Sequence, residues 1–383
     1  MSRPSPFSAI STDARMNFDY SPEERALAEQ ARRFLSDSAP LSLLRDMLEG
    51  RGSERAAALW GAASELGLAA IAIPEEYGGA EMGYTALCAL AEEVGRAAAP
   101  LPLLPSRYLA AEALLHGGTD AQKRRWLPGL ARGELIGTAL VGPDPVGAIY
   151  AAGKISGVVQ PVAHGMEAAV LVVSAREGEA SSRLYLVDLG QPGVRRTALK
   201  TIDDSRPHAN LQLNAALAEP LGAEGGPEAI DRLLTRAAVL VAFEQLGGAD
   251  ACLQMTLNYV QQRRTFARLI GSYQAVKHRL ADVYVANELA RSNAYYAAWA
   301  LERDAPELAL AAATARVSAT EAYEFASENN IQLHGGIGFT WEADPHLHYR
   351  RSRLLAHTLG PLGVWQDRLI KALDQPEKTP RGL

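Results

Sequence analysis

The C-terminal part of the chain constrains the fold most, because it reads as long helices joined by short loops. Apolar residues recur at helical spacing through residues 230–262, 274–303, 306–330 and 362–374. Segments of this length with short connections favour helices that pack against one another as antiparallel neighbours. We therefore predict a helical bundle over residues 223–383.

The pattern changes twice before that bundle. Segments such as AAVLVVSA and SRLYLVDL are short, rich in Val and Leu, and separated by turn-forming residues, which predicts a β domain over residues 136–222. Residues 16–135 read as helices, and the first of them begins with Ser21 followed three residues later by Glu24, a capping box. Residues 1–15 are rich in Ser and Pro, and we expect them to be disordered. The predicted fold class is mainly α with a central β domain.

Composition and charge narrow the function. The 383 residues carry a net charge of −6 with no basic block, so we expect no nucleic-acid partner. The only cysteines, Cys88 and Cys252, lie in apolar segments of helical spacing, which predicts buried thiols rather than a disulfide. No apolar run is long enough to cross a membrane and no signal segment opens the chain, so we expect a cytoplasmic protein.

Two segments contain residues suited to binding a nucleotide. Gly335, Gly336 and Gly338 directly follow a long helix, and glycine lets a phosphate approach the backbone, although a helix C-cap also explains such glycines. The second segment, RRTFARLIGSYQ at 263–274, offers Arg for a pyrophosphate, Phe for an adenine and Gln for a ribose. A pair of cations that complements the end of a helix is the simpler alternative for its arginines.

Together with LGLAAIAIPEEYGG (66–79) and QKRRWLPGLARGELIGTAL (122–140), these segments resemble the acyl-CoA dehydrogenase family, in order and along nearly the whole chain. The resemblance implies an N-terminal helical domain, a middle β-barrel and a C-terminal four-helix bundle. It also implies an FAD cofactor, an acyl-CoA substrate that loses hydrogen from its α and β carbons, and electron-transfer flavoprotein or a similar acceptor. Because a neighbouring subunit completes the flavin site in this family, we expect a homo-oligomer or a hetero-oligomer with a second acyl-CoA dehydrogenase-like chain.

The residues that the resemblance assigns to the ADP half of the flavin all match the family's pattern. Three come from the loop between two long helices, and three from the glycine-rich segment are supplied across a dimer contact. They are Arg263, Phe266 and Gln274 from the loop, and Gln332, Gly335 and Gly336 from the glycine-rich segment.

The segments that hold the flavin ring depart from the family's pattern. Val141 and Gly142 stand where the family has Thr-Glu, and no Gly-Ser-Asp follows them. Residues 161–163 are Pro, Val and Ala in place of the family's Trp-Ile-Thr. Several hydrogen-bond donors are thus absent together, which predicts an incomplete ring half of the site.

The residues at the positions of the catalytic base also differ from the family's pattern. Leu359 and Ala237 occupy the two positions at which members of the family carry their catalytic Glu. Glu244 lies on the helix of Ala237, about two turns or ~10 Å along the same face and within its apolar stretch. Burial in such an apolar stretch raises the pKa of a carboxyl group, so Glu244 is our candidate catalytic base. A buried carboxylate that pairs with an arginine is the alternative.

Three functions stay open on the sequence alone. The first is an FAD-dependent acyl-CoA dehydrogenase for a bulky or branched acyl group, with Glu244 as its base. The second is a non-catalytic, cofactor-completing subunit of a heteromeric acyl-CoA dehydrogenase, and the third is a flavin-dependent oxidase or monooxygenase. We predict no metal site, because the C-terminal histidines lack a ligand pattern. Turn chemistry accounts for the polar residues at 203–206.

Overall fold

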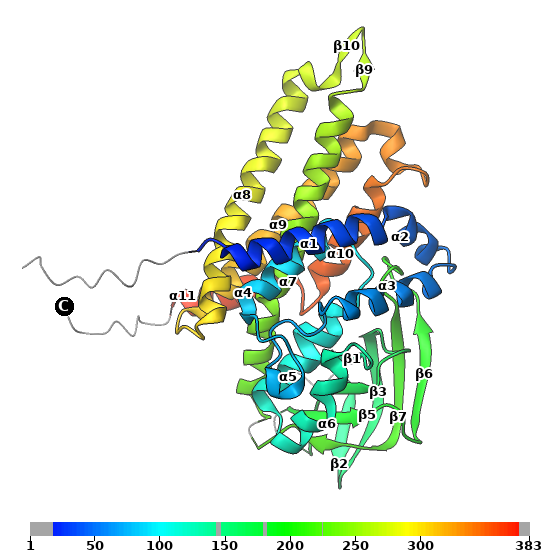
Figure 1. Ribbon diagram of the computed structural model, residues 1–383, viewed down its shortest axis with the longest axis vertical. Coiled ribbons are helices and arrows are strands. Elements are labelled where there is room, and N and C mark those ends of the chain that lie inside the picture. The colour runs from blue at the N-terminus through cyan, green and yellow to red at the C-terminus, as the bar shows by residue number, and fades with distance from the viewer. Residues whose placement is uncertain (1–17, 143–146, 179–181, 224, 375–383) are drawn as a thin grey trace, which may run out of the picture.

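The computed structural model describes residues 18–142, 147–178, 182–223 and 225–374. The predicted disorder of residues 1–15 lies outside these ranges. Within them the chain has helices before and after a central pair of β-sheets, which confirms the predicted fold class (Figure 1). No helix of the described part is both long and apolar enough to span a membrane.

Helices build the first part of the molecule. The predicted capping box is present, since the Ser21 hydroxyl accepts from the Glu24 N–H at 3.2 Å and the Glu24 carboxylate accepts from the Ser21 N–H at 2.6 Å. Cys88 lies on α4 (Gly83–Arg96) and is fully buried, as predicted. The elements are α1 (Pro22–Ser38), α2 (Leu41–Leu48), α3 (Ser53–Glu65), η1 (Glu75–Tyr77), α4 (Gly83–Arg96), the π-helical η2 (Leu104–Ala111), α5 (Glu112–Gly117) and α6 (Asp120–Ala131).

Two four-stranded sheets form the middle of the chain. The first has the strand order β1-β4-β5-β8, with β1 parallel to β4, and the second has the order β2-β3-β7-β6. Apolar side chains of both sheets, such as Val173 and Leu211, share one core, so the sheets pack face to face. The strands are β1 (Gly137–Leu140), β2 (Ala148–Ala151), β3 (Lys154–Ala163), β4 (Val170–Ala175), β5 (Arg183–Asp188), β6 (Val194–Leu199), β7 (His208–Leu217) and β8 (Glu219–Pro220).

Helix α7 runs through the centre of the molecule, between α4 of the first part and α9 of the bundle. Two glycines let α4 and α7 touch through their backbones. A Cβ atom added to Gly95 would lie 1.8 Å from the Glu244 carbonyl oxygen, and one added to Gly247 would lie 1.8 Å from the Glu92 carbonyl oxygen. This close crossing fixes the position of Glu244. The bundle helices are α7 (Pro227–Val260), α8 (Gln274–Glu302), α9 (Leu308–His334), α10 (Pro345–His357) and α11 (Leu362–Leu373).

The two ends of the bundle differ. One end meets the sheets, whereas the other projects beyond the rest of the molecule and carries a small hairpin at the top of Figure 1. The hairpin consists of β9 (Arg264–Thr265) and β10 (Arg268–Leu269) and leads into η3 (Ile270–Ser272). A further short helix, η4 (Gly335–Phe339), follows α9.

Candidate active site and cofactor surface

The loop between α7 and α8 presents its side chains to solvent. Phe266 and Ala267 form the turn of the hairpin with φ angles of 52° and 61°, which match a type I′ turn. Such a turn prefers Asn-Gly, so the backbone at Phe266 is strained, and strain of this kind gathers at functional sites. The Phe266 side chain is 89% exposed, and Arg263 and Gln274 on either side of the hairpin are also exposed. All three loop residues predicted for the ADP half are therefore accessible to a ligand or a partner.

The glycine-rich segment is tied to the end of the same helix. Tyr259, in the last turn of α7, stacks on His334 with ring centroids 4.2 Å apart, and its hydroxyl donates to the His334 carbonyl oxygen at 3.3 Å. A Cβ atom added to Gly335 or Gly336 would meet no atom within 4 Å, and Gln332 is exposed. The structure thus brings the second predicted ADP segment to the end of the bundle that carries the first, with open space above its backbone.

A cavity of about 250 Å³ lies where the middle sheets, η2 and the segment after α10 meet. Its wall contains Val141, Pro161 and Ala163, which the resemblance sets at the family's ring-binding positions, and Leu359, which it sets at the position of a catalytic Glu. No carboxylate lines the cavity among the residues that the structure describes. The remaining wall consists of Leu104, Pro105, Leu109, Leu140 and Leu354 with their apolar neighbours, and of the polar residues His164, Arg206, His208, His357 and Thr358.

Glu244, the predicted base, is fully buried behind this cavity wall. Its Oε1 accepts a hydrogen bond from Nη2 of Arg206 and lies 3.9 Å from Nη1 of Arg351. Arg351 donates from Nε to Asp203 at 2.6 Å, so two guanidinium groups and two carboxylates pair where the 203–206 turn, α7 and α10 meet. Glu244 therefore has the environment expected under the alternative interpretation, a buried carboxylate that pairs with an arginine. Proton abstraction by Glu244 stays a prediction.

Burial and charge together set the protonation of the surrounding groups. Burial alone would raise the pKa of Asp203, but Arg351 and the Ser205 hydroxyl lower it below its usual value. Burial, helped by the nearby charge of Arg206, lowers the pKa of His164 to about 3. Burial also lowers the pKa of His208, whose Nδ1 lies 2.8 Å from the Arg206 carbonyl oxygen. An imidazole with a pKa near 3 is too weak a base to remove an α-proton at neutral pH.

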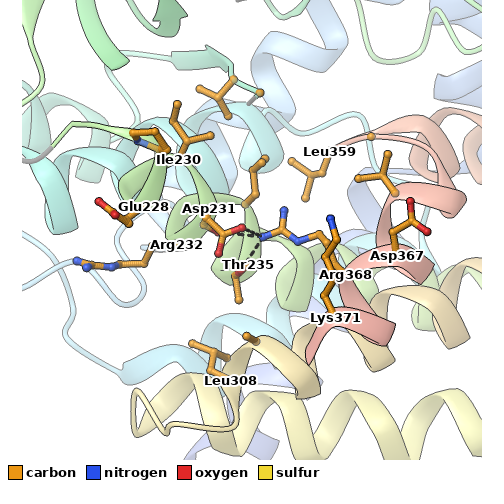
Figure 2. Close-up of a pocket in the computed structure, with 17 residues that line it drawn as sticks. Glu228, Ile230, Asp231, Arg232, Thr235, Leu308, Leu359, Asp367, Arg368 and Lys371 are labelled. Atoms are coloured by element: carbon orange, nitrogen blue, oxygen red, sulfur yellow. Dashed lines mark hydrogen bonds and ion pairs between the residues drawn. The ribbon is translucent and has the colours of Figure 1, made fainter. Parts of the chain in front are cut away.

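A larger pocket of about 970 Å³ adjoins the cavity and shares Leu359 and Gly360 with it. Figure 2 shows Arg368 of α11 at its centre, bonded to Asp231 and Thr235 of α7. The sequence patterns gave no indication of this contact, because α7 and α11 are separated by more than a hundred residues. The apolar part of the pocket is formed by Val141, Ile230, Leu234, Leu308, Leu359 and Val364.

Comparison with known proteins decides the family. Residues 21–134 match the acyl-CoA dehydrogenase N-terminal domain, and residues 224–373 match the acyl-CoA dehydrogenase C-terminal domain. The chain is 35% identical to acyl-CoA dehydrogenase IpdE2 of Mycobacterium tuberculosis over 341 residues, which cover 88% of this chain and 93% of that protein. The chain belongs to the acyl-CoA dehydrogenase family. The predicted family and the oxidoreductase class are therefore confirmed.

Solved structures of acyl-CoA dehydrogenases share the fold. The chain is 32% identical to a variant of the Tcur3481-Tcur3483 steroid ACAD, with a TM-score of 0.82 and coverage of 92% of this chain and 97% of that one. It is 26% identical to a chain of the ChsE4-ChsE5 complex from Mycobacterium tuberculosis, with a TM-score of 0.83 and coverage of 94% and 100%. Each of these two structures is named after a pair of components, Tcur3481 with Tcur3483 and ChsE4 with ChsE5.

The residues present fit the two halves of FAD unequally. At the exposed end, Arg263, Phe266 and Gln274 offer a cation, an aromatic face and an amide to solvent. At the junction, the 250 Å³ cavity falls below the ~300–1,000 Å³ that is usual for small-molecule pockets. Val141, Pro161 and Ala163 in its wall have no side-chain hydrogen-bond donor to offer an isoalloxazine. The exposed residues of this acyl-CoA dehydrogenase chain suit the ADP half of FAD, whereas these three cavity residues do not suit the ring half.

Sequence reasoning missed the partners of Glu244. Turn chemistry explained the 203–206 segment, and that turn is present, since the Ser205 N–H donates to the Asp203 carboxylate at 3.1 Å. The same turn also directs Arg206 toward α7, where it meets Glu244. A glutamate within an apolar helix signals that a cationic partner exists, but it does not say which arginine the fold will bring there.

Proposed function

We propose that this chain is a subunit of an FAD-dependent acyl-CoA dehydrogenase built from two unlike chains, and that it supplies the ADP half of the flavin site. The reaction of the assembly is α,β-desaturation of an acyl-CoA thioester. A second chain of the same family supplies the ring half and the catalytic carboxylate. Bound FAD supplies the hydride acceptor, and electron-transfer flavoprotein or a similar protein takes up the electrons.

The contrast between the two halves of the flavin site carries this proposal. Six residues suited to the ADP half lie at one end of the bundle, and each is either exposed or open above its backbone. At the junction, the cavity is small, and no carboxylate lines it in the described part of the chain. A chain that carried a complete active site would need suitable residues at both places, and this chain has them only at the end that suits the ADP half.

The exposed residues have distinct roles in this proposal. Arg263 donates hydrogen bonds to the pyrophosphate, because a guanidinium matches phosphate oxygens with paired N–H groups. Phe266 packs against the adenine, and the strained turn holds its ring away from the chain's own core. Gln274 binds a ribose hydroxyl, and Gly335 and Gly336 let the nucleotide approach the backbone.

The similar structures support two unlike chains and a bulky acyl group. One of them is a steroid enzyme and the other is a complex, and both carry paired component names. We therefore propose a bulky, ring-bearing acyl group as the substrate class of the assembly.

The second candidate function is a chain that catalyses the dehydrogenation without a partner. Glu244 favours this candidate, because its carboxylate is desolvated near the junction. To act as a base, Glu244 would have to leave Arg206. Separating a buried ion pair costs about 3–5 kcal/mol. We therefore assign Glu244 to holding Arg206 in the cavity wall.

An absorption spectrum tests the proposal. The chain purified alone and incubated with FAD is expected to show no flavin band that bleaches when a panel of acyl-CoAs is added anaerobically. Co-expression with a second acyl-CoA dehydrogenase-like chain is expected to give a yellow complex that does bleach. Bleaching by the chain alone would contradict the proposal and return attention to Glu244.

Substitution of Glu244 separates the two candidates further. In the co-expressed complex, Glu244→Gln is expected to leave the turnover per bound flavin within about threefold, because the base lies on the other chain. Loss of turnover by orders of magnitude with normal flavin content would show that Glu244 is the base. Glu167→Gln, at a half-exposed carboxylate of the middle domain, is the matched control.

A further inference from the structure

Two cations of α11 lie side by side in the larger pocket. Arg368 and Lys371 are three residues apart on one helix and both line the pocket, so they share a face. Figure 2 shows the Lys371 ammonium and a guanidinium nitrogen of Arg368 directed toward the same part of the pocket, below Leu359.

Arg368 keeps free donors although it is firmly held. All of its hydrogen bonds leave from Nη2, which donates to the Asp231 carboxylate, to the Asp231 carbonyl oxygen at 3.3 Å and to the Thr235 hydroxyl at 3.0 Å. The guanidinium also lies 4.6 Å over the Trp365 ring, which fixes its plane. Its Nε and Nη1, and the Lys371 ammonium, have no hydrogen-bond or ion-pair partner among the described residues. The free donors of Arg368 are therefore preorganised, and the exposed Lys371 ammonium is available to the same ligand.

The centre of the pocket carries one positive charge in excess. Asp231 offsets the charge of Arg368, whereas Lys371 has no carboxylate within ion-pair distance in the described part of the chain. Figure 2 places Glu228 and Asp367 on opposite sides of the pocket, away from the central pair. One carboxylate on a ligand would balance the centre.

The rest of the pocket suits an apolar body. Ile230 and Leu234 of α7 face Val364 of α11 across a volume of about 970 Å³, at the upper end of the ~300–1,000 Å³ usual for ligand pockets. A linear chain of a few carbons would leave most of this space unfilled, so ring systems fit it better.

We propose that this pocket binds a carboxylate carried on a bulky apolar body, with Arg368 and Lys371 holding the carboxylate. Binding at this site does not require FAD and does not depend on which chain carries the flavin ring. A free ring acid and an acyl-CoA thioester with a carboxylate at its far end share this chemistry, and the experiment below separates the two.

Calorimetric titration of the flavin-free full chain tests the proposal, with adamantane-1-carboxylate and the neutral adamantane-1-methanol as probes. The acid is expected to bind about tenfold more tightly than the alcohol, the gain usual for hydrogen bonds to a charged group. Lys371→Gln removes one positive charge without breaking any hydrogen bond or ion pair among the described residues. It is expected to weaken acid binding by about tenfold and to leave alcohol binding unchanged.

Arg232→Gln is the matched control, because Arg232 lines the same pocket but points away from its centre in Figure 2. This variant is expected to bind the acid as the unmodified chain does. Equal binding of acid and alcohol, no binding of either, or an unaffected Lys371→Gln variant would overturn the proposal.

Two coenzyme A thioesters identify the source of the carboxylate. If glutaryl-CoA displaces the adamantane acid and butyryl-CoA does not, the natural ligand of the site is a thioester with a distal carboxylate. Displacement by neither, with the acid still bound tightly, would assign it to a free acid. Because no step of the experiment uses flavin, its failure is distinguishable from failure of the two-chain assembly.

Discussion

Two regions of the molecule contrast in burial. The tip of the bundle, formed by the 263–274 loop and the 332–336 segment, is largely exposed, whereas the junction of the 203–206 turn with α7 and α10 is buried. At the tip, Arg263 and Phe266 are exposed, and an added Cβ at Gly336 would meet nothing within 4 Å. At the junction, the Arg206–Glu244 pair is buried and an added Cβ at Gly247 would collide with a backbone oxygen at 1.8 Å. The tip is therefore free to bind something outside the chain, whereas Glu244 at the junction is held by contacts within the chain.

This difference shows how a fold can keep half of a binding site. The ADP half needs only exposed residues on a rigid helix end, and these cost the chain little stability. The ring half needs hydrogen-bond donors in a cavity at the junction of domains, and here Val141, Pro161 and Ala163 offer none from their side chains. Substitutions at the junction are therefore expected to lower stability, and substitutions at the tip to lower flavin binding.

The largest effect is expected from glycines that differ only in their surroundings. Gly247→Ala places a methyl group against the Glu92 carbonyl oxygen on α4 and is expected to destabilise the chain by more than about 3 kcal/mol. Gly336→Ala is the matched control at the tip and is expected to change stability by less than about 1 kcal/mol. Thermal denaturation of both variants measures this, and equal losses would remove the contrast.

Removal of the Glu244 carboxylate is expected to have the next largest effect. Glu244→Ala leaves the buried Arg206 without its partner and is expected to cost about 3–5 kcal/mol, read from urea denaturation. Combining it with Arg206→Met removes the orphaned charge and is expected to restore part of that loss. A single variant as stable as the unmodified chain would show that the pair does not hold the junction.

Acid is expected to weaken the junction before it affects the tip. Burial lowers the pKa of His164 to about 3 and that of His348 to about 4, whereas both titrate near 6.5 in the unfolded chain. The unfolded state therefore binds more protons below pH 6.5, so stability is complete above that pH and falls as the pH drops toward 4. At pH 5 each histidine is expected to cost about 2 kcal/mol. His348→Gln should flatten the curve of stability against pH, and an unchanged curve would contradict this cause.

The smallest change in stability is expected at the tip. Arg263→Ala and Phe266→Ser alter exposed side chains, so stability is expected to stay within about 0.5 kcal/mol. The flavin content of the co-expressed complex is nevertheless expected to fall strongly, as measured by absorption after gel filtration. Normal flavin content in both variants would show that the tip does not hold the nucleotide.

The sequence predicted the fold well because periodicity is a local property. The helix expected at 274–303 is α8 (Gln274–Glu302), and the helix expected at 230–262 is α7 (Pro227–Val260). Helix α2 (Leu41–Leu48) was not predicted, because its eight residues give too little periodicity and Pro40 caps it without a side-chain hydrogen bond. Helix α10 (Pro345–His357) was likewise not predicted.

The candidate site was only half predictable. The residues of the tip lie in two short motifs, and the resemblance of these motifs to the family implied a nucleotide, which stays a prediction. The junction and the larger pocket depend on residues far apart in sequence, such as Arg206 with Glu244 and Asp231 with Arg368. Such pairs arise from the packing of α7 against other elements, which no local pattern specifies.

The ratio of FAD to protein chains in the purified two-chain complex tests the central claim most directly. Absorption of released flavin, set against the protein concentration, gives this ratio without any assumption about substrate. If the chain supplies only the ADP half, the complex holds one FAD for every two chains. One FAD for every chain would contradict the account, because the junction of this chain would then have to hold a flavin ring of its own.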